Sequence, residues 1–419
     1  MLKIAGGGSH SFLFVFLFLF VVSGCAPHVA QTPILATIPL GDVTWKENVP
    51  VLRLRGNPYE LGYQHGTILR QQVRASVANM ESFVNRQVHI PFVGSWLARR
   101  TLARAWKQMV PFVSDDFLEE MRGLSDGAGI PLETLHRIHA LPEWMAMTCA
   151  SFAVFGKASE GGRLIHGRNL DWSIQSGVQR YAAVFVVHPT RGHPFVNCGW
   201  LGFIGVVSGI NDQGISVSEI GAESADSSLK GTPMPFLLRR VLQESNNLDQ
   251  TVELIRTAQR TGGYNYLFGD AKKCQAVVLE TTRNHAALFK ADQSSSDPYA
   301  VNLSDALFRA DWALDPAIRE AQKAACGNPS RPGLEPPIGS SSYEVRYVGQ
   351  GRLLTQFYGK IQPEIAMAVL RAIVPSSNIQ SVVYAYPEMW LATARGRQPA
   401  ATNKYIYFDL EELFGEKKY

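Results

Sequence analysis

The stretch Cys149-Ala-Ser-Phe-Ala-Val-Phe155, followed by Gly162-Arg-Leu-Ile-His-Gly-Arg-Asn-Leu-Asp-Trp172, decides how this chain folds. Both halves alternate like half-buried strands, and the short linker between them lets the two strands pair as a hairpin. Such a hairpin would bring together the thiol of Cys149, the guanidinium of Arg168 and the carboxylate of Asp171. A free cysteine is mostly protonated at neutral pH, so a cysteine nucleophile needs a nearby cation to stabilise its thiolate.

The character of the sequence changes at Cys149. Before it the sequence is mostly helical: Asn57, Pro58 and Glu60 supply an N-cap, a first-turn proline and a capping-box acid, which predict a helix to about Val88. After it, strand-like blocks alternate with pairs of helical segments. This order favours stacked sheets with helices outside them.

The first residues have the form of an export signal. Lys3 precedes an apolar run that ends at Val22-Ser23-Gly24-Cys25, and the run is too short for a comfortable membrane span. The last four residues resemble the lipobox of bacterial lipoproteins, and an ordinary cleaved signal peptide is the alternative. We therefore expect a lipoprotein signal peptide over 1–24, lipidation of Cys25 and a tether over 25–50. Such a protein would be anchored in a bacterial cell envelope, on the periplasmic face of the outer membrane.

The composition excludes some partners. The net charge is only +4 and no basic cluster is evident, which does not favour a nucleic-acid partner. Three further cysteines, Cys198, Cys274 and Cys326, have irregular spacings that do not resemble metal ligands. We expect them to be buried as small hydrophobic residues, with one disulfide as the alternative in an exported protein.

Several motifs resemble those of the acyl-coenzyme A:isopenicillin N (6-aminopenicillanic acid) acyltransferase family. This is a family of N-terminal-nucleophile hydrolases, with cholylglycine hydrolases and N-acylethanolamine acid amidases as wider relatives. The motifs are Gly56-Asn-Pro-Tyr-Glu-Leu-Gly-Tyr-Gln-His-Gly66, Thr148-Cys-Ala-Ser-Phe152, Gly167-Arg-Asn-Leu-Asp-Trp172 and Trp200-Leu-Gly-Phe-Ile-Gly205 with Gly209-Ile-Asn-Asp-Gln-Gly214. Weaker blocks follow in the family's order at 266–270, 342–347 and 381–384. The resemblance covers about residues 51–410 and implies an α+β fold, a four-layer αββα sandwich of two mainly antiparallel sheets.

Members of this family are cut directly before the nucleophile. The resemblance implies cleavage between Thr148 and Cys149, which leaves two associated chains: a mostly helical segment over 51–148 and a catalytic segment over 149–419. An α-amine has a pKa of about 7.7–8.0, so the freed amine of Cys149 is partly neutral at physiological pH and can accept the thiol proton. Nucleophile and base then belong to one residue, and no metal or organic cofactor is implied.

The resemblance also assigns roles to individual residues. Cys149 resembles the nucleophile, Arg168 the arginine that supports the thiolate and the substrate carbonyl, and Asp171 the aspartate that binds the new α-amine. Asn302 resembles a donor to the tetrahedral oxyanion, and Arg346 a late arginine that braces the site. The sequence departs from the family's pattern at Thr148, where Gly or Asn is common, and at Ala150, Leu201 and Val301.

Each assignment has a structural alternative. Cys149 could be a buried strand cysteine, and Arg168 with Asp171 an ion pair that closes a hairpin. His65 is expected to be structural, and His166 is left out as lying on the strand face opposite Arg168. Glu219 and Glu223 follow a hairpin beside the expected pocket and are not counted among the site residues.

We therefore expect a cysteine amidohydrolase or acyltransferase that cleaves linear amide bonds of small N-acyl compounds through a thioester. Export argues against a coenzyme A donor, because that metabolite is cytosolic, and so favours hydrolysis. One alternative is a phospholipase-like esterase on the same fold. Another is a non-catalytic lipoprotein that binds a ligand.

Overall fold

The computed structural model describes residues 41–87, 94–145, 148–326 and 342–415. The expected signal peptide and Cys25 lie outside these residues. Within them, no helix has both the length and the apolar character needed to cross a membrane. Strand β1 (Asp42–Lys46) already pairs with β2 (Val49–Gly56), so regular structure begins inside the segment that was expected to be a tether.

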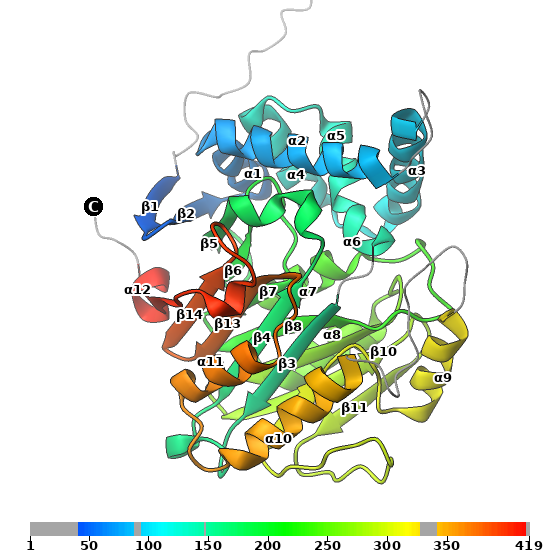
Figure 1. The fold of residues 1–419 in the computed structure, drawn as a ribbon. Helices are drawn as coiled ribbons and strands as arrows, with labels where there is room; N and C mark the ends of the chain where they lie inside the picture. The colour runs from blue at the N-terminus through cyan, green and yellow to red at the C-terminus, as the bar shows by residue number, and fades with distance from the viewer. Residues whose placement is uncertain (1–40, 88–93, 146–147, 327–341, 416–419) are drawn as a thin grey trace, which may run out of the picture. The chain divides into compact units, whose positions relative to one another are not determined.

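Two β-sheets form the centre of the fold (Figure 1). The nine-stranded sheet has the order β1-β2-β5-β6-β7-β8-β9-β10-β11, and the six-stranded sheet has the order β12-β3-β4-β13-β14-β15. All neighbours are antiparallel except β2 and β5. The other strands of the larger sheet are β5 (Ala182–Pro189), β6 (Phe195–Trp200), β7 (Ser208–Asn211), β8 (Ile215–Gly221), β9 (Tyr264–Asp270), β10 (Gln275–Thr281) and β11 (Ala286–Lys290). Those of the smaller sheet are β12 (Ala306–Arg309), β3 (Thr148–Val154), β4 (Ile165–Asp171), β13 (Asn378–Ala385), β14 (Glu388–Thr393) and β15 (Ile406–Asp409).

The sheets face each other, and helices cover their outer faces. Strand β3 contacts β8 and β9 across the interior, α7 and α8 pack on β8 and β9, and α11 packs on β4 and β13. This arrangement is the four-layer αββα sandwich that the sequence predicted. The helices after Cys149 are α7 (Met234–Glu244), α8 (Leu248–Thr257), α9 (Pro316–Ala325), the π-helical turn η6 (Ser342–Val348), α10 (Gly349–Gln356), α11 (Pro363–Ala372) and α12 (Leu410–Phe414).

The segment before Cys149 is helical, as expected, but its first helix is shorter than predicted. The capping box is present: the Asn57 side chain accepts from the Glu60 amide, and the Glu60 carboxylate accepts from the Asn57 amide. The helix nevertheless breaks near Leu69, whose φ of 55° is left-handed and cannot belong to a continuous α-helix. The helices are α1 (Pro58–Thr67), α2 (Arg70–Gln87), α3 (Gly94–Met109), α4 (Asp115–Ala128), α5 (Leu132–His139) and α6 (Leu141–Trp144).

Glycines set how closely α1 and α4 pack. A Cβ added at Gly62 would lie 1.8 Å from the carbonyl oxygen of Glu120, and one added at Gly123 would lie 2.0 Å from that of Tyr59. Any side chain at either position would therefore push the helices apart. The glycines of the first sequence motif thus have a packing role.

The histidine of the same motif is structural, as the sequence predicted. His65 is buried, and its Nε2 accepts a hydrogen bond of 2.9 Å from the amide of Gly202. Burial lowers the pKa of His65 to about 3, so the ring is a neutral acceptor at physiological pH. This bond ties α1 to the loop after β6.

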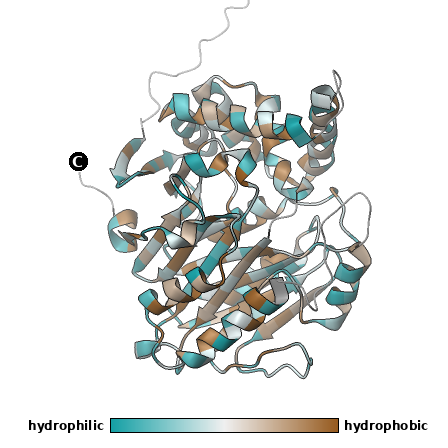
Figure 2. Cartoon of the chain, in the orientation of Figure 1, coloured by the Kyte–Doolittle hydropathy of each residue, from teal (hydrophilic) through white to brown (hydrophobic). Residues whose placement is uncertain are grey.

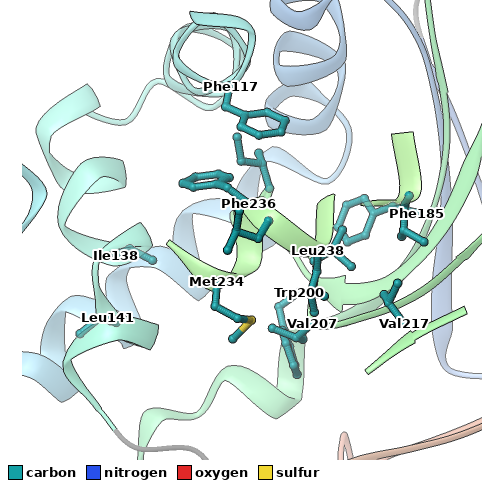
Figure 3. Packing of buried hydrophobic residues seen from close by; sticks show 14 of the residues in the cluster. Phe117, Ile138, Leu141, Phe185, Trp200, Val207, Val217, Met234, Phe236 and Leu238 are labelled. Carbon is teal, nitrogen blue, oxygen red and sulfur yellow. The ribbon is translucent and has the colours of Figure 1, made fainter. Parts of the chain in front are cut away.

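The largest apolar cluster lies between the N-terminal helices and the outer face of the nine-stranded sheet (Figure 3). Phe117 of α4 stacks on Phe236 of α7 with ring centroids 5.0 Å apart. Met234 and Leu238, also on α7, are buried in the same cluster as Trp200. Most helices carry both hydrophilic and hydrophobic residues (Figure 2), as elements with one buried face do.

Candidate active site

Strands β3 and β4 form the hairpin predicted from the sequence. Their antiparallel register places Ser151 opposite Arg168 and Thr148 opposite Asp171. Cys149, Arg168 and Asp171 are all fully buried. The hairpin therefore places a thiol, a guanidinium and a carboxylate inside the protein.

The thiol of Cys149 lies beside a buried ion pair. Its Sγ is 3.3 Å from Nη2 of Arg168 and 3.8 Å from Oε1 of Glu219. The same Nη2 donates to Oε1 of Glu219 at 2.6 Å, and Nη1 of Arg168 donates to the hydroxyl of Ser208 at 2.8 Å. Strand β8 thus supplies an acidic residue that completes a three-membered cluster with the hairpin.

Burial keeps this thiol protonated in the uncut chain. Burial raises the pKa of the Cys149 thiol well above its usual range, the Glu219 carboxylate raises it further, and the guanidinium of Arg168 lowers it. Burial also raises the pKa of Glu219, which Arg168 opposes. A further positive charge near Sγ would therefore favour the thiolate.

A second cluster surrounds the backbone nitrogen of Cys149. This nitrogen donates to Oδ1 of Asp311 at 2.9 Å, and Nη1 of Arg346 donates to Oδ2 of Asp311 at 3.2 Å. Nη2 of Arg346 forms a short ion pair with Asp171. Arg346, expected to brace the site, thus joins two carboxylates on either side of the bond predicted to be cut.

Asp171 lies beside that bond without holding its nitrogen. Its Oδ1 accepts from the side-chain amide of Asn378 at 3.0 Å, and its Oδ2 faces Arg346. Burial raises the pKa of Asp171 to about 6, against the lowering effect of Arg346 and Asn378. In the uncut chain the nitrogen of Cys149 donates to Asp311 instead, and the amine-binding role of Asp171 stays a prediction.

Asn302, which the resemblance assigned as an oxyanion donor, lies in the loop before β12. Asn302 is exposed, and its amide group bonds to both the backbone nitrogen and the carbonyl of Ser295. It therefore closes a loop ahead of β12 in the uncut chain, and its role as an oxyanion donor stays a prediction.

Sequence reasoning missed two residues of this site. Glu219 ends the alternating run of β8, and a fully buried acid in such a strand was a signal that could have been followed. Asp311 comes two residues after β12 and becomes meaningful only when β12 is known to pair with β3. No pattern in the sequence alone indicates that pairing.

His166 was assigned to the wrong face of its strand. Side chains two residues apart in a strand share a face, so His166 lies on the same side as Arg168. Its Nδ1 is 2.8 Å from the hydroxyl of Ser216, and its Nε2 is 3.0 Å from that of Ser218 and 3.1 Å from that of Ser151. Both ring nitrogens thus have hydroxyl partners, and burial lowers the pKa of His166 to about 3, so the cluster is neutral.

Two hollows lie near the site. The first is apolar and narrow, about 30 Å³, and lies between the N-terminal helices and the residues around Trp172 and Trp200. The second is more polar, about 100 Å³, and is lined by Glu143, Glu223 and Tyr264 among others. Pro142, shortly before the predicted cut, lines both hollows.

Among the described residues, several buried polar atoms of the two interior sheets and the segments around them have no hydrogen-bond partner. They include Nε of Arg168, Oε2 of Glu219, Nε of Arg346, Nε1 of Trp172 and the hydroxyl of Tyr266. Such atoms are costly to bury and are uncommon in a finished core. In the part of the chain that the structure describes, no group of three or more His, Cys, Asp or Glu residues could hold a metal ion.

The family comparison agrees with the motifs. Residues 158–303 match the model of the family described as acyl-coenzyme A:6-aminopenicillanic acid acyl-transferase. This match confirms the resemblance seen in the sequence. It contains Arg168, Asp171 and Glu219 and begins after Cys149.

Similar proteins are found among both curated sequences and solved structures. The chain is 24% identical to protein dcd1B of Dictyostelium discoideum over 407 residues, covering 88% of this chain and 75% of that protein. It is 22% identical to acid ceramidase of Mus musculus over 277 residues, covering 60% of this chain and 68% of the ceramidase. A solved Caenorhabditis elegans ortholog of N-acylethanolamine-hydrolyzing acid amidase has a TM-score of 0.41 and 14% identity, covering 62% of this chain and 100% of that chain.

Proposed function

We propose that this protein is a cysteine amidohydrolase or acyltransferase of the N-terminal-nucleophile type. It is cut between Thr148 and Cys149 and then cleaves linear amide bonds of N-acyl compounds. The observation that carries the proposal is the pair of contacts at Cys149, with Arg168 on its thiol and Asp311 on its nitrogen. A merely structural cysteine needs no buried charges beside it, and burying them is costly. The family match and the similarity to acid ceramidase support the same reaction class.

The cutting step uses only atoms already in contact or adjacent in the chain. Sγ of Cys149 attacks the carbonyl carbon of Thr148, so an S–C bond forms and the C–N bond between the two residues breaks. The thiol proton passes to the departing nitrogen of Cys149. Water then hydrolyses the thioester, which frees the Thr148 carboxylate and restores the thiol. The product carries a new α-amine on Cys149.

Turnover repeats this chemistry on a substrate amide. The neutral α-amine accepts the thiol proton, and the thiolate attacks the amide carbonyl. The amide C–N bond breaks, the leaving amine receives the proton, and an acyl thioester remains on Cys149. Water releases the carboxylic acid, or an acceptor amine takes the acyl group. Arg168 stabilises the thiolate throughout, because its Nη2 lies on Sγ.

The two hollows differ in polarity as the two halves of an N-acyl compound do. The apolar hollow beside Trp172 and Trp200 suits the acyl group, and the polar hollow with Glu143 and Tyr264 suits the amine portion. Both are small in the uncut chain.

Intact-mass analysis tests the proposal. Wild type should give two fragments, the larger starting at Cys149, and Cys149→Ala should stay whole and inactive. Cys198→Ala is the matched control: Cys198 is also a fully buried strand cysteine, its pKa is raised to about 12 by burial, and its Sγ contacts Met389 at 3.8 Å. A cut and active Cys149→Ala protein would refute the proposal.

A substrate pair separates the reaction classes on the cut enzyme. Release of amine from an N-acyl amide, without release of fatty acid from a phospholipid, is the result expected. The opposite result would favour the esterase alternative. Folded wild type that stays whole and does not react with an acyl-chloromethyl probe at Cys149 would favour a ligand-binding lipoprotein.

The anchor at Cys25 belongs to the same proposal. It rests on the sequence around Val22-Ser23-Gly24-Cys25, which lies outside the described residues. Cys25→Ser should move the protein from the membrane to the soluble fraction while leaving its cutting unchanged. A variant that stays with the membrane would contradict the lipid anchor.

A further inference from the structure

Asp311 lies opposite Cys149 because of strand register. Strand β12 pairs with β3 so that Arg309 is opposite Ser151. Continuing this antiparallel register by two residues places Asp311 opposite Cys149. There the Cys149 amide donates to Oδ1 of the Asp311 side chain at 2.9 Å. A carboxylate thus accepts a hydrogen bond from the nitrogen that cutting would turn into an amine.

The charges that face this nitrogen come from several elements. Asp171 and Arg168 lie on β4, Glu219 on β8, Arg346 on η6 and Asp311 after β12. If all were ionised, three carboxylates would face two guanidinium groups. The two positive charges would not balance the three negative ones. A newly formed ammonium on Cys149 would supply the missing positive charge. Asp171 already uses both oxygens on Arg346 and Asn378, whereas Oδ1 of Asp311 is on the nitrogen itself.

We propose that Asp311 is the primary amine-binding residue of this enzyme. It holds the nitrogen of Cys149 before the cut, binds the freed α-amine afterwards, and sets the pH at which that amine becomes a base. This inference rests on the proposed function. It gives Asp311 a role in catalysis, since it touches an atom that carries the transferred proton.

The role has a definite electrostatic sign. A carboxylate within hydrogen-bonding distance stabilises the ammonium form, so it shifts amine deprotonation to higher pH, typically by about 1–3 units. Arg346 moderates this shift, because its guanidinium bridges Asp311 and Asp171. Removing the charge of Asp311 should therefore let the amine act as a base at lower pH.

The experiment is the pH profile of kcat/KM for Asp311→Asn in the cut enzyme, with an N-acyl amide substrate. The asparagine keeps an acceptor oxygen but removes the charge. Its rising limb should move to lower pH by about 1 unit relative to wild type. Asp305→Asn is the matched control: it removes the same charge at the other end of β12, where Asp305 bonds to the amide of Lys157.

A second variant keeps the test decisive if Asp311→Asn is folded but stays uncut. Asp311→Glu retains the charge, so it should be cut and keep a rising limb close to that of wild type. Cutting of Asp311→Glu and Asp305→Asn alongside an uncut Asp311→Asn would support the proposal. The proposal would be overturned if the rising limb of the kcat/KM profile of Asp311→Asn lay at the same pH as in wild type. Equal cutting and equal pH profiles of kcat/KM in all three variants would also overturn it. These outcomes compare variants of a working enzyme, so they are distinct from failure of wild type to be cut.

Discussion

Two polar clusters lie next to each other in the interior, on the same three strands. Strands β3, β4 and β8 supply the first cluster with Cys149, Arg168 and Glu219, and the second with Ser151, His166 and Ser218. All six side chains are fully buried. The first cluster contains an ion pair and has unpartnered atoms on Arg168 and Glu219, whereas the second is neutral.

The two clusters show how buried polar groups with a chemical role differ from those that only stabilise packing. A neutral hydroxyl–imidazole network satisfies its own hydrogen bonds and stabilises the packing of the two sheets against each other. A buried ion pair seldom improves stability over apolar residues of similar size. Charge that persists beside a thiol, with polar atoms left over, therefore points to chemistry.

The largest effect is expected from Arg168→Gln. This change leaves Glu219 buried without its cation and removes the donor on Sγ, so cutting and turnover should fall by about 10³-fold. Cutting is measured by intact mass, and turnover is measured by amine release. Arg239→Gln breaks another buried ion pair, with Glu120, and is the control. Arg239→Gln should lower the free energy of unfolding to a similar degree while the chain is still cut. Equal loss of cutting in Arg168→Gln and Arg239→Gln would contradict a special role of the charged cluster.

A smaller effect is expected from Glu219→Gln. The carboxylate raises the pKa of the Cys149 thiol, so its removal should lower that pKa and make the thiolate more available. Labelling of the cut protein by a small thiol reagent at a fixed neutral pH should become about tenfold faster. Labelling that slows or stays constant would mean that Glu219 does not act on the thiol through its charge.

The neutral cluster should tolerate loss of one member. Ser218→Ala removes a hydroxyl from Nε2 of His166, which keeps Ser151 as a partner. The expected cost is about 1 kcal/mol in the free energy of unfolding, measured with denaturant, with cutting unchanged. A loss of cutting in the folded variant would place this cluster in the chemistry after all.

The sequence predicted the features that depend on neighbours along the chain. The β3–β4 hairpin followed from alternation and a short linker, and the helix cap at Asn57 from local hydrogen bonding. The αββα layers followed from the order of elements and the family resemblance. Each of these needs only local patterns or a known template.

The rest depends on contacts between distant strands. Asp311 meets Cys149 because β12 docks on the edge of β3, and Glu219 meets the thiol because the two sheets stack face to face. A motif match also could not show that the side chain of Asn302 bonds to Ser295 in its own loop. Register between segments far apart in the chain is a tertiary property, and one residue of slip exchanges the two faces of a strand.

The smallest predicted effect concerns pH, and it tests the neutrality of the second cluster directly. Burial lowers the pKa of His166 to about 3, so the folded protein binds no proton there at pH 6 while the unfolded chain, with a pKa near 6.5, does. This contribution to stability is present above pH 6.5 and is lost as the pH falls toward 3. Between pH 7.5 and 6.0, wild type should therefore lose about 0.8 kcal/mol more unfolding free energy than His166→Gln does. His65→Gln should reduce the pH dependence of the unfolding free energy to a similar degree, because burial also lowers the pKa of His65 to about 3. If His65→Gln flattens the curve and His166→Gln does not, His166 is charged in the folded protein, and the cluster around it shares the electrostatics of the Cys149 site.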